Sequence, residues 1–226
     1  REEVRFVASR FGAERVMCLY GLTEAGPNGT YLAPEEHEEK AGSVGKYAAL
    51  HCEVAIVDEQ GNEVAPGEVG EIVLRGESVM KGYYKDEEKT NDVIRNGWLY
   101  TGDLARRDED GYIWIVDRKK DVIISGGVNI YPKEVEDVLR THPAIADVAV
   151  IGVPHPEWGE TAKAFVVLSA PLELLAEDCK RFLSGKLADY KIPRLYEAIA
   201  ELPRNATGKV LKQVLRAREA AQEVQG

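Results

Sequence analysis

Residues 112–132 read YIWIVDRKKDVIISGGVNIYP, and the pattern of apolar residues changes within this stretch. The apolar run that ends at Val116 has the length of a buried β-strand. A charged run, 117–121, interrupts it, and after the glycine pair at 126–127 a proline opens a helical pattern. The sequence therefore predicts that one domain ends and another begins near Arg118.

On the amino-terminal side, residues 1–117 are rich in expected strands. The expected elements are a helix over 1–11, a short buried strand over 15–19, and strands over 53–58, 70–75 and 112–116. Turns that contain glycine, proline or asparagine separate the later strands. Such close spacing favours a small barrel or a curled sheet over βαβ units.

On the carboxyl-terminal side, residues 118–226 alternate between the two kinds of element. The expected strands cover 121–124, 146–153, 162–168 and 195–199, and the expected helices cover 132–141, 172–187 and 210–222. The first of these helices carries an apolar stripe at Val135, Val138 and Leu139. The alternation predicts a small α+β domain of about 110 residues, within the usual size range of domains.

Composition narrows the class of protein. The net charge of −10 argues against a nucleic-acid binder, because phosphate binding needs a basic surface. No run of 18 apolar residues is present, so we expect no transmembrane helix, and residues 1–10 lack the apolar core of a signal peptide. The three cysteines, Cys18, Cys52 and Cys179, are too far apart for a metal site and odd in number. They indicate reduced thiols in a cytoplasmic protein.

Three segments carry residues suited to chemistry. Tyr20–Glu24 (YGLTE) combines an aromatic ring that can stack on a base, a hydroxyl that can bind phosphate and a carboxylate that can hold Mg²⁺. Asp103 ends the segment GWLYTGD, and a carboxylate can accept hydrogen bonds from both hydroxyls of a ribose. Lys209 ends the loop LPRNATGK and can bring a positive charge to a phosphate oxyanion. Each segment alone also fits a polar turn, an Asx-type turn or a solvated surface lysine.

In this order, the segments resemble the adenylate-forming superfamily of acyl-CoA ligases, peptide-synthetase adenylation domains and firefly-type luciferases. The matching segments are 20–24, 69–72, 82–84, 97–103, 117–121, 125–132 and 203–209. The resemblance covers nearly the whole chain. It implies a mixed fold, α/β and α+β, in which 1–117 is the carboxyl-terminal, β-rich piece of a large domain and 118–226 is a small mobile domain.

The resemblance implies a two-step reaction in which a carboxylate and ATP form acyl-AMP, and coenzyme A then takes the acyl group. It places Tyr20 near adenine, Thr23 at phosphate, Glu24 on Mg²⁺, Asp103 and Arg118 at the nucleotide, and Lys209 at the reacting groups. The candidate catalytic residues are Lys209, Thr23 and Glu24, with Glu24 as the metal ligand. The candidate cofactor-binding residues are Tyr20, Gly21, Thr23, Asp103, Arg118, Lys120, Gly126, Gly127, Trp158 and Tyr190.

Lys120 matches the hinge about which the small domain of such enzymes rotates between the two steps, and a solvated turn lysine is the alternative interpretation. The rotation is expected to bring Gly126 and Gly127 to the pantetheine arm of coenzyme A, where glycine permits a close backbone approach. Trp158 and Tyr190 match positions that contact coenzyme A, and packing aromatics are an equal alternative.

Two further groups have a structural interpretation. We expect Trp98, Tyr100, Tyr112 and Trp114 to form core of the β-rich part rather than a cofactor site. The acidic run over 35–40 is typical of a solvated loop.

The superfamily's phosphate-binding loop is absent from the chain, so we expect a fragment of a fatty or aryl acid–CoA ligase that is inactive alone. It would associate with the missing amino-terminal part or with itself. A carrier-loading adenylation domain, a non-catalytic module and, less readily, a luciferase-like oxygenase are the alternatives.

Overall fold

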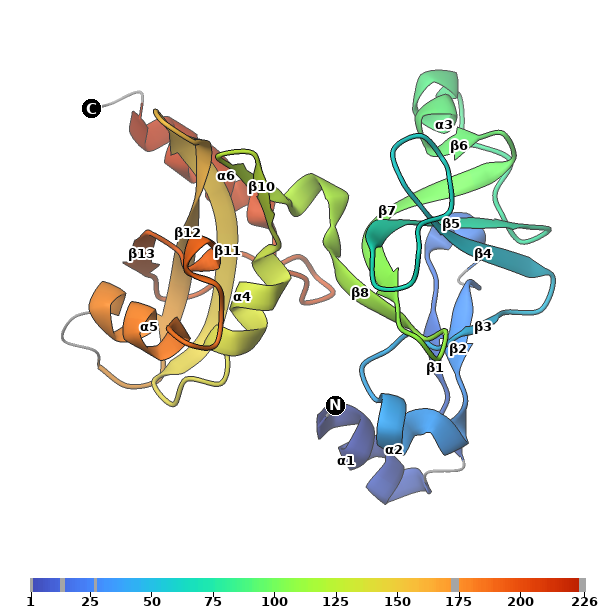
Figure 1. Ribbon diagram of the computed structural model, residues 1–226, viewed down its shortest axis with the longest axis horizontal. Helices are drawn as coiled ribbons and strands as arrows, with labels where there is room; N and C mark the ends of the chain where they lie inside the picture. Colours follow the sequence, from blue (N-terminus) through green and yellow to red (C-terminus); the bar gives the residue numbers. More distant parts are fainter. Residues whose placement is uncertain (1, 13–14, 27, 172–174, 224–226) are drawn as a thin grey trace. The chain divides into compact units, whose positions relative to one another are not determined.

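The computed structural model describes residues 2–12, 15–26, 28–171 and 175–223. The chain divides into two compact units, Arg1–Lys119 and Lys120–Gly226 (Figure 1). Within the described residues, none of the helices combines the length and the apolar character needed to cross a membrane.

The first unit begins with helix α1 (Glu2–Phe11), as the sequence predicts. The helix ends at Gly12, whose positive φ of 89° suits glycine and whose amide donates to the Ala8 carbonyl over 2.9 Å. A small antiparallel sheet follows, made of β1 (Cys18–Tyr20), β2 (Thr30–Leu32) and β3 (Tyr47–Ala48). The prediction of a buried strand over 15–19 is wrong, because β1 is shorter and Leu19 lies exposed.

A five-stranded sheet forms the larger part of the first unit. Its strands are β4 (Cys52–Val57), β5 (Val69–Gly76), β6 (Ile94–Arg95), β7 (Trp98–Arg107) and β8 (Ile113–Arg118). The order is β4-β5-β7-β6, β8 also pairs with β7, and every pair is antiparallel. Helix α3 (Glu87–Val93) precedes β6 and is capped by Asp86, which accepts from the Lys89 amide over 3.0 Å. The sheet packs buried Ile56, Ile72, Leu74, Leu99 and Ile113 together.

Four aromatic residues are predicted to form this core, but only Tyr112 is buried. Trp98, Tyr100 and Trp114 are half-buried. The Arg75 guanidinium covers the Trp98 ring at 4.5 Å, and the Trp114 indole N–H donates to Asp108 over 3.0 Å. Trp98 and Trp114 each bury one part of the ring, while the other part contacts a cationic or polar neighbour, as is common for amphipathic aromatic side chains.

The acidic run over 35–40 is more ordered than a solvated loop, so that prediction is wrong in part. It forms the short helices η3 (Pro34–Glu36) and α2 (His37–Lys40). Glu36 accepts from the Tyr112 hydroxyl over 2.6 Å. Burial acts to raise the pKa of the Glu36 carboxyl, but its hydrogen bonds hold that pKa below the ordinary value. Lys40 binds Asp108 over 3.2 Å. Glu35, Glu38 and Glu39 do lie exposed.

The second unit contains one mixed sheet. Its elements are η4 (Lys119–Asp121, at the boundary), β9 (Ile123–Ser125), β10 (Val128–Ile130), α4 (Pro132–Leu139), β11 (Ile145–His155), β12 (Gly159–Leu168), α5 (Leu175–Leu183), η5 (Asp189–Lys191), β13 (Leu195–Ala198) and α6 (Lys212–Glu223). The order is β10-β9-β12-β11, and β13 pairs with β12 in parallel (Figure 1). This is the α+β arrangement that the alternating pattern predicts.

Strand β11 faces two cores because successive side chains alternate between the faces of a sheet. Val148 and Val150 join Val135 and Leu139 of α4, which confirms the predicted stripe, together with Cys179 and Leu183 of α5. Ala149, Ile151 and Val153 pack on the other face with Leu215 of α6. The helices therefore cover both faces of the sheet.

Several element boundaries differ from those predicted, as three examples show. The helix expected over 172–187 is α5, Leu175–Leu183; residues 172–174 lie outside the described residues, and Gly185, at φ 76°, follows its carboxyl end. Asp121 belongs to η4 rather than to a strand. Helix α6 begins at Lys212, since Val210 pairs with Arg204 in an isolated β-bridge.

The buried thiol of Cys179 predicts a loss of stability at alkaline pH. Burial raises its pKa from 9.0 to about 11, so the unfolded chain ionises first as pH rises. The stabilisation is complete below pH 9 and falls between pH 9 and 11, by about 2 to 3 kcal/mol at most. Urea unfolding across this range is expected to show a smaller fall for Cys179→Ala than for the parent chain, and equal falls would contradict the assignment.

Candidate functional site

The segment Tyr20–Glu24 leaves strand β1 and turns into the short helix η2 (Thr23–Ala25). Ala25 is fully buried and anchors the turn, while Gly21 and Thr23 lie exposed. Glu24 is half-buried: its Oε1 accepts from the Tyr83 hydroxyl over 2.9 Å, and its carbonyl accepts from the Met80 amide over 2.7 Å. The segment following β5 therefore holds Glu24 in place.

Tyr20 and Asp103, two predicted nucleotide-binding residues far apart in the sequence, meet in the structure. The Tyr20 hydroxyl donates to Asp103 Oδ2 over 2.8 Å. Burial first, and then the negative charge of Asp103, raise the pKa of Tyr20 above its ordinary value. The phenol therefore stays a protonated donor, and it orients the carboxylate.

A bulge in strand β7 aims Asp103. Glu71 pairs with Leu104 and Val73 with Tyr100, so residues 101–103 all lie opposite the single residue Ile72. Gly102 makes this possible with a φ of 74°, which strains any residue that has a Cβ. Bulges often redirect a side chain beside a functional site.

The bulge also argues against the alternative that Asp103 serves only an Asx-type turn. The Thr101 hydroxyl fills that local role, since it donates to the Ile72 carbonyl over 2.8 Å and accepts from the Asp103 amide over 3.1 Å. The Asp103 carboxylate instead contacts side chains of other strands. Arg118 pairs opposite Asp103 on β8, and its Nε lies 3.7 Å from Oδ1.

Glu71 is a residue of this site that sequence reasoning missed. It is buried on β5, its Oε1 accepts from the Gly102 amide over 2.9 Å, and its Oε2 accepts from Lys119 Nζ over 2.9 Å. The Glu71 carboxylate thus accepts from the Gly102 amide, which the bulge leaves without a strand partner. The same carboxylate binds Lys119, the residue before Lys120. The available signal was a glutamate that directly precedes the apolar run 72–74 within a strand.

We expect Glu71→Ala to disturb both the fold and the predicted nucleotide site. The Gly102 amide and Lys119 would lose their acceptor, which costs about 1 to 3 kcal/mol of unfolding free energy. The affinity for AMP should fall as well, because the bulge that aims Asp103 loosens. Glu71→Gln keeps an amide oxygen for Gly102 and should retain most of both quantities. Urea unfolding and calorimetric titration with AMP measure the two effects, and an Ala variant that resembles the parent in both would refute this role.

Lys209 ends an ordered turn in the second unit. The Asn205 side-chain oxygen accepts from the amides of Lys209 over 2.8 Å and of Thr207 over 3.1 Å. The backbone closes the same turn, since the Asn205 amide donates to the Lys209 carbonyl over 3.0 Å. Lys209 lies exposed at the end of this turn. Its backbone is therefore fixed while its side chain reaches the surface.

Gly126 and Trp158, each predicted to contact coenzyme A, lie side by side in the second unit. Gly126 and Gly127, at φ 57° and 80°, form the turn between β9 and β10. The Gly126 amide donates to the Trp158 carbonyl over 2.9 Å, and a Cβ at Gly126 would lie 3.4 Å from the indole ring. That distance is an ordinary contact, so the positive φ rather than the space beside the indole is what favours glycine here.

The Trp158 ring has partners that sequence reasoning missed. The His155 ring stacks on it at 4.1 Å, and the Arg194 guanidinium lies 3.6 Å from its centroid. Both groups cannot occupy the same face at such distances, so they cover opposite faces of the indole. This favours the packing interpretation of Trp158 in the observed conformation. Tyr190 is exposed on η5, and Lys191 lies 5.8 Å from its ring.

Lys120 is exposed within η4, where the two compact units divide. Glu24 offers the kind of ligand that Mg²⁺ takes when it binds mainly through substrate phosphates, a single carboxylate. Among the residues that the structure describes, no group of three or more His, Cys, Asp or Glu side chains could hold a metal ion. The donor set therefore fits a metal that arrives with a phosphate ligand better than a permanent metal centre.

Comparison with known families gives two matches. Residues 1–84 match the profile of the AMP-binding enzymes, and residues 134–209 match the profile of the AMP-binding enzyme C-terminal domain. The chain is 44% identical over 198 residues to indoleacetate–CoA ligase of Aromatoleum aromaticum, with 88% of this chain and 39% of the relative covered. It is 46% identical over 201 residues to a long-chain-fatty-acid–CoA ligase of Bacillus subtilis, with 87% and 35% covered.

Solved structures agree with these matches. The o-succinylbenzoate CoA synthetase of Bacillus subtilis, bound to its acyl-adenylate intermediate, superposes with a TM-score of 0.82 at 41% identity, covering 89% of this chain and 41% of that one. The same enzyme with ATP and magnesium gives a TM-score of 0.80 at 40% identity, covering 91% and 41%. The chain thus spans about two fifths of these relatives. On these matches, which cover most of its length, the chain belongs to the family of AMP-binding enzymes.

Proposed function

We propose that the protein containing this chain is an AMP-forming carboxylic acid–CoA ligase. The single observation that carries the proposal is that Tyr20 and Arg118 both contact the carboxylate of Asp103. An aromatic ring, an acidic acceptor and a guanidinium are the groups that a base, a ribose and a phosphate require.

In the first step, the carboxylate of the acid attacks the α-phosphate of ATP, and pyrophosphate leaves. Asp103 accepts hydrogen bonds from the ribose hydroxyls, and Arg118 assists at the nucleotide. Thr23 donates to phosphate, and Glu24 would hold Mg²⁺, which would supply positive charge beside the phosphates. Lys209 stabilises the negative charge that develops between the carboxylate and the α-phosphate. Tyr20 lies beside adenine and orients Asp103.

In the second step, the thiol of coenzyme A attacks the acyl carbon, the acyl–oxygen bond breaks, and AMP leaves. Lys209 belongs to the second unit, whereas Tyr20, Glu24 and Asp103 belong to the first. We propose that the second unit rotates about Lys120 between the steps, so that Gly126 and Gly127 replace Lys209. A hinge of this kind changes φ and ψ at few residues. Trp158 and Tyr190 contact coenzyme A in this proposal, which requires Arg194 or His155 to move off the Trp158 ring.

The acid is proposed to be an aryl or fatty acid. Curated relatives that align with most of this chain are named as ligases for indoleacetate, long-chain fatty acids and 2-succinylbenzoate. Each of these acids has a carboxylate together with either an aromatic ring or a long alkyl chain. The names support a class of substrate rather than a particular one.

The test is an assay of the natural protein at its full length with ATP, Mg²⁺ and a panel of aryl and fatty acids, with and without coenzyme A. We expect AMP and pyrophosphate, with a thioester formed in equal amount to AMP when coenzyme A is present. Formation of ADP and phosphate, or no nucleotide turnover with any acid of either class, would contradict the proposal.

A further inference from the structure

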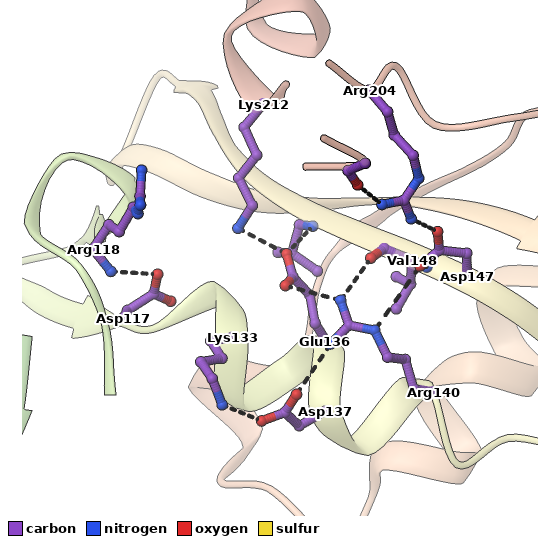
Figure 2. A network of polar contacts seen from close by, with 12 residues as sticks. Asp117, Arg118, Lys133, Glu136, Asp137, Arg140, Asp147, Val148, Arg204 and Lys212 are labelled. Atoms are coloured by element: carbon purple, nitrogen blue, oxygen red, sulfur yellow. Dashed lines mark hydrogen bonds and ion pairs between the residues drawn. The ribbon is translucent and has the colours of Figure 1, made fainter. Parts of the chain in front are cut away.

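A buried carboxylate in the second unit joins three elements. Glu136 of α4 accepts from the Val150 amide of β11 over 2.8 Å and from Lys212 Nζ, at the start of α6, over 2.8 Å. Arg140 approaches its other oxygen at 3.4 Å (Figure 2). The side chains of Glu136 and Lys212 are only 8% and 14% exposed, so this pair is part of the packed interior. Lys212 follows Lys209 closely in the sequence.

The same network continues to the residues that precede Lys209. Arg140 donates to the Val148 carbonyl over 3.3 Å, and its Nε lies 3.9 Å from Asp147 (Figure 2). Asp147 sits at an irregularity in the pairing of β11, where its carboxylate also accepts from the Val148 amide over 2.9 Å. The other oxygen of Asp147 binds the Arg204 guanidinium.

Arg204 makes a second contact that concerns Lys209 directly. Its other terminal nitrogen donates to the carbonyl of Gly208, which belongs to the peptide bond that precedes Lys209. The loop is therefore held on both sides of the lysine, by Arg204 through Asp147 before it and by Lys212 through Glu136 after it. A fixed guanidinium with two donors suits a bridge of this kind, because lysine offers no comparable fork.

The two anchors differ in what they contribute to folding. The Glu136–Lys212 pair is buried, so removal of either partner would leave a charge in the interior and destabilise the unit. The Asp147–Arg204 pair has side chains that are 25% and 42% exposed. Exposed pairs contribute little to folding stability, so this pair is better explained by what it positions.

We propose that Arg204 and Asp147 are positioning residues for adenylation: they fix the peptide before Lys209 so that its ammonium meets the developing charge. This inference rests on the role proposed for Lys209. It predicts that loosening the loop slows the first step, because a small displacement of a catalytic group lowers the rate strongly. The second step, in which Lys209 is replaced by Gly126 and Gly127, should not depend on it.

The experiment compares Arg204→Met and Asp147→Asn with a matched control in the natural protein at its full length. Arg218→Met removes an arginine that is 43% exposed and paired with Glu197, which is 26% exposed, in the same unit. ATP–pyrophosphate exchange measures adenylation, and thioester formation from supplied acyl-AMP measures the second step. We expect Arg204→Met and Asp147→Asn to lower the turnover number for exchange by about 10- to 100-fold, with KM for ATP and the second step nearly unchanged. Arg218→Met should change neither step, and Arg204→Lys should recover part of the exchange rate.

Each contrary result has a defined meaning when Lys209→Ala is measured in parallel. Unchanged exchange in Arg204→Met, with exchange lost in Lys209→Ala, overturns this inference and leaves the proposed function intact. Equal losses in both steps, accompanied by a lower melting temperature, show a merely structural role and also overturn it. Normal exchange in Lys209→Ala removes the proposed role of the lysine, and the inference falls with it.

Discussion

Replacement of Lys209 by alanine is expected to lower the rate of acyl-adenylate formation by about 10²- to 10³-fold, the usual cost of losing one preorganised charge-stabilising donor. Negative charge gathers between the attacking carboxylate and the α-phosphate, and an ammonium group placed there acts more strongly in the transition state than in the ground state. The backbone of Lys209 is already ordered by Asn205, so the alanine variant should keep the turn. ATP–pyrophosphate exchange measures the loss.

The second step separates this role from general damage. Thioester formation from supplied acyl-AMP should stay within a few-fold of the parent rate, because the lysine acts only in the first step. Lys180→Ala provides the matched control, since Lys180 is an exposed lysine of the same unit, on α5. If Lys209→Ala lowered both steps alike, the assignment of this lysine to adenylation would be wrong.

Asp103→Ala is expected to weaken nucleotide binding by about 10- to 100-fold or more, since a hydrogen bond to a charged group contributes about 1.5 to 3 kcal/mol. The loss removes the acceptor for the ribose hydroxyls and also the partner of the Tyr20 hydroxyl. Calorimetric titration with AMP measures the affinity directly and needs no turnover.

Tyr20→Phe separates the contribution of the Tyr20 hydroxyl to nucleotide affinity from that of the Asp103 carboxylate. It removes the hydroxyl that orients Asp103 but keeps the ring and the carboxylate, so we expect a loss of affinity below about 10-fold. Deoxyadenosine monophosphate should bind the parent protein more weakly than AMP and should bind Asp103→Ala about as well as AMP does. Equal binding of AMP to the parent and to Asp103→Ala would exclude a ribose contact.

Periodicity predicts most elements of the second unit but fewer of the first, in which β2, β3, α3, β6 and β7 are not predicted. Strands such as β4 and β5 follow from closely spaced apolar runs, and the buried stripe of α4 follows from the spacing of Val135, Val138 and Leu139. These predictions succeed because burial of one face depends mainly on local spacing. Burial of a whole element is not local. Strand β1 is exposed at Leu19 although its residues are apolar, because the composition of a strand does not say what covers it.

The residues of the candidate site likewise differ in whether local sequence could reveal them. Tyr20, Asp103 and Arg118 lie in recognisable segments, and the structure brings their side chains together. Glu71 could not be found in this way, because its role depends on the strand register that opens the bulge opposite Ile72. Arg204 is similar, since its partner Asp147 comes from a distant strand. Contacts that require a pairing register or a tertiary approach are not encoded in local spacing.

The central claim is that the oxygen of a carboxylate attacks the α-phosphate of ATP, and an isotope experiment tests it most directly. A carboxylic acid labelled with oxygen-18 in its carboxylate is supplied to the natural protein with ATP, Mg²⁺ and coenzyme A, and the AMP is examined by mass spectrometry. Because the acyl–oxygen bond breaks in the second step, AMP should leave with one labelled oxygen on its phosphate. Unlabelled AMP, or label found in inorganic phosphate beside ADP, would contradict adenylation of the acid and with it the roles proposed for Asp103 and Lys209.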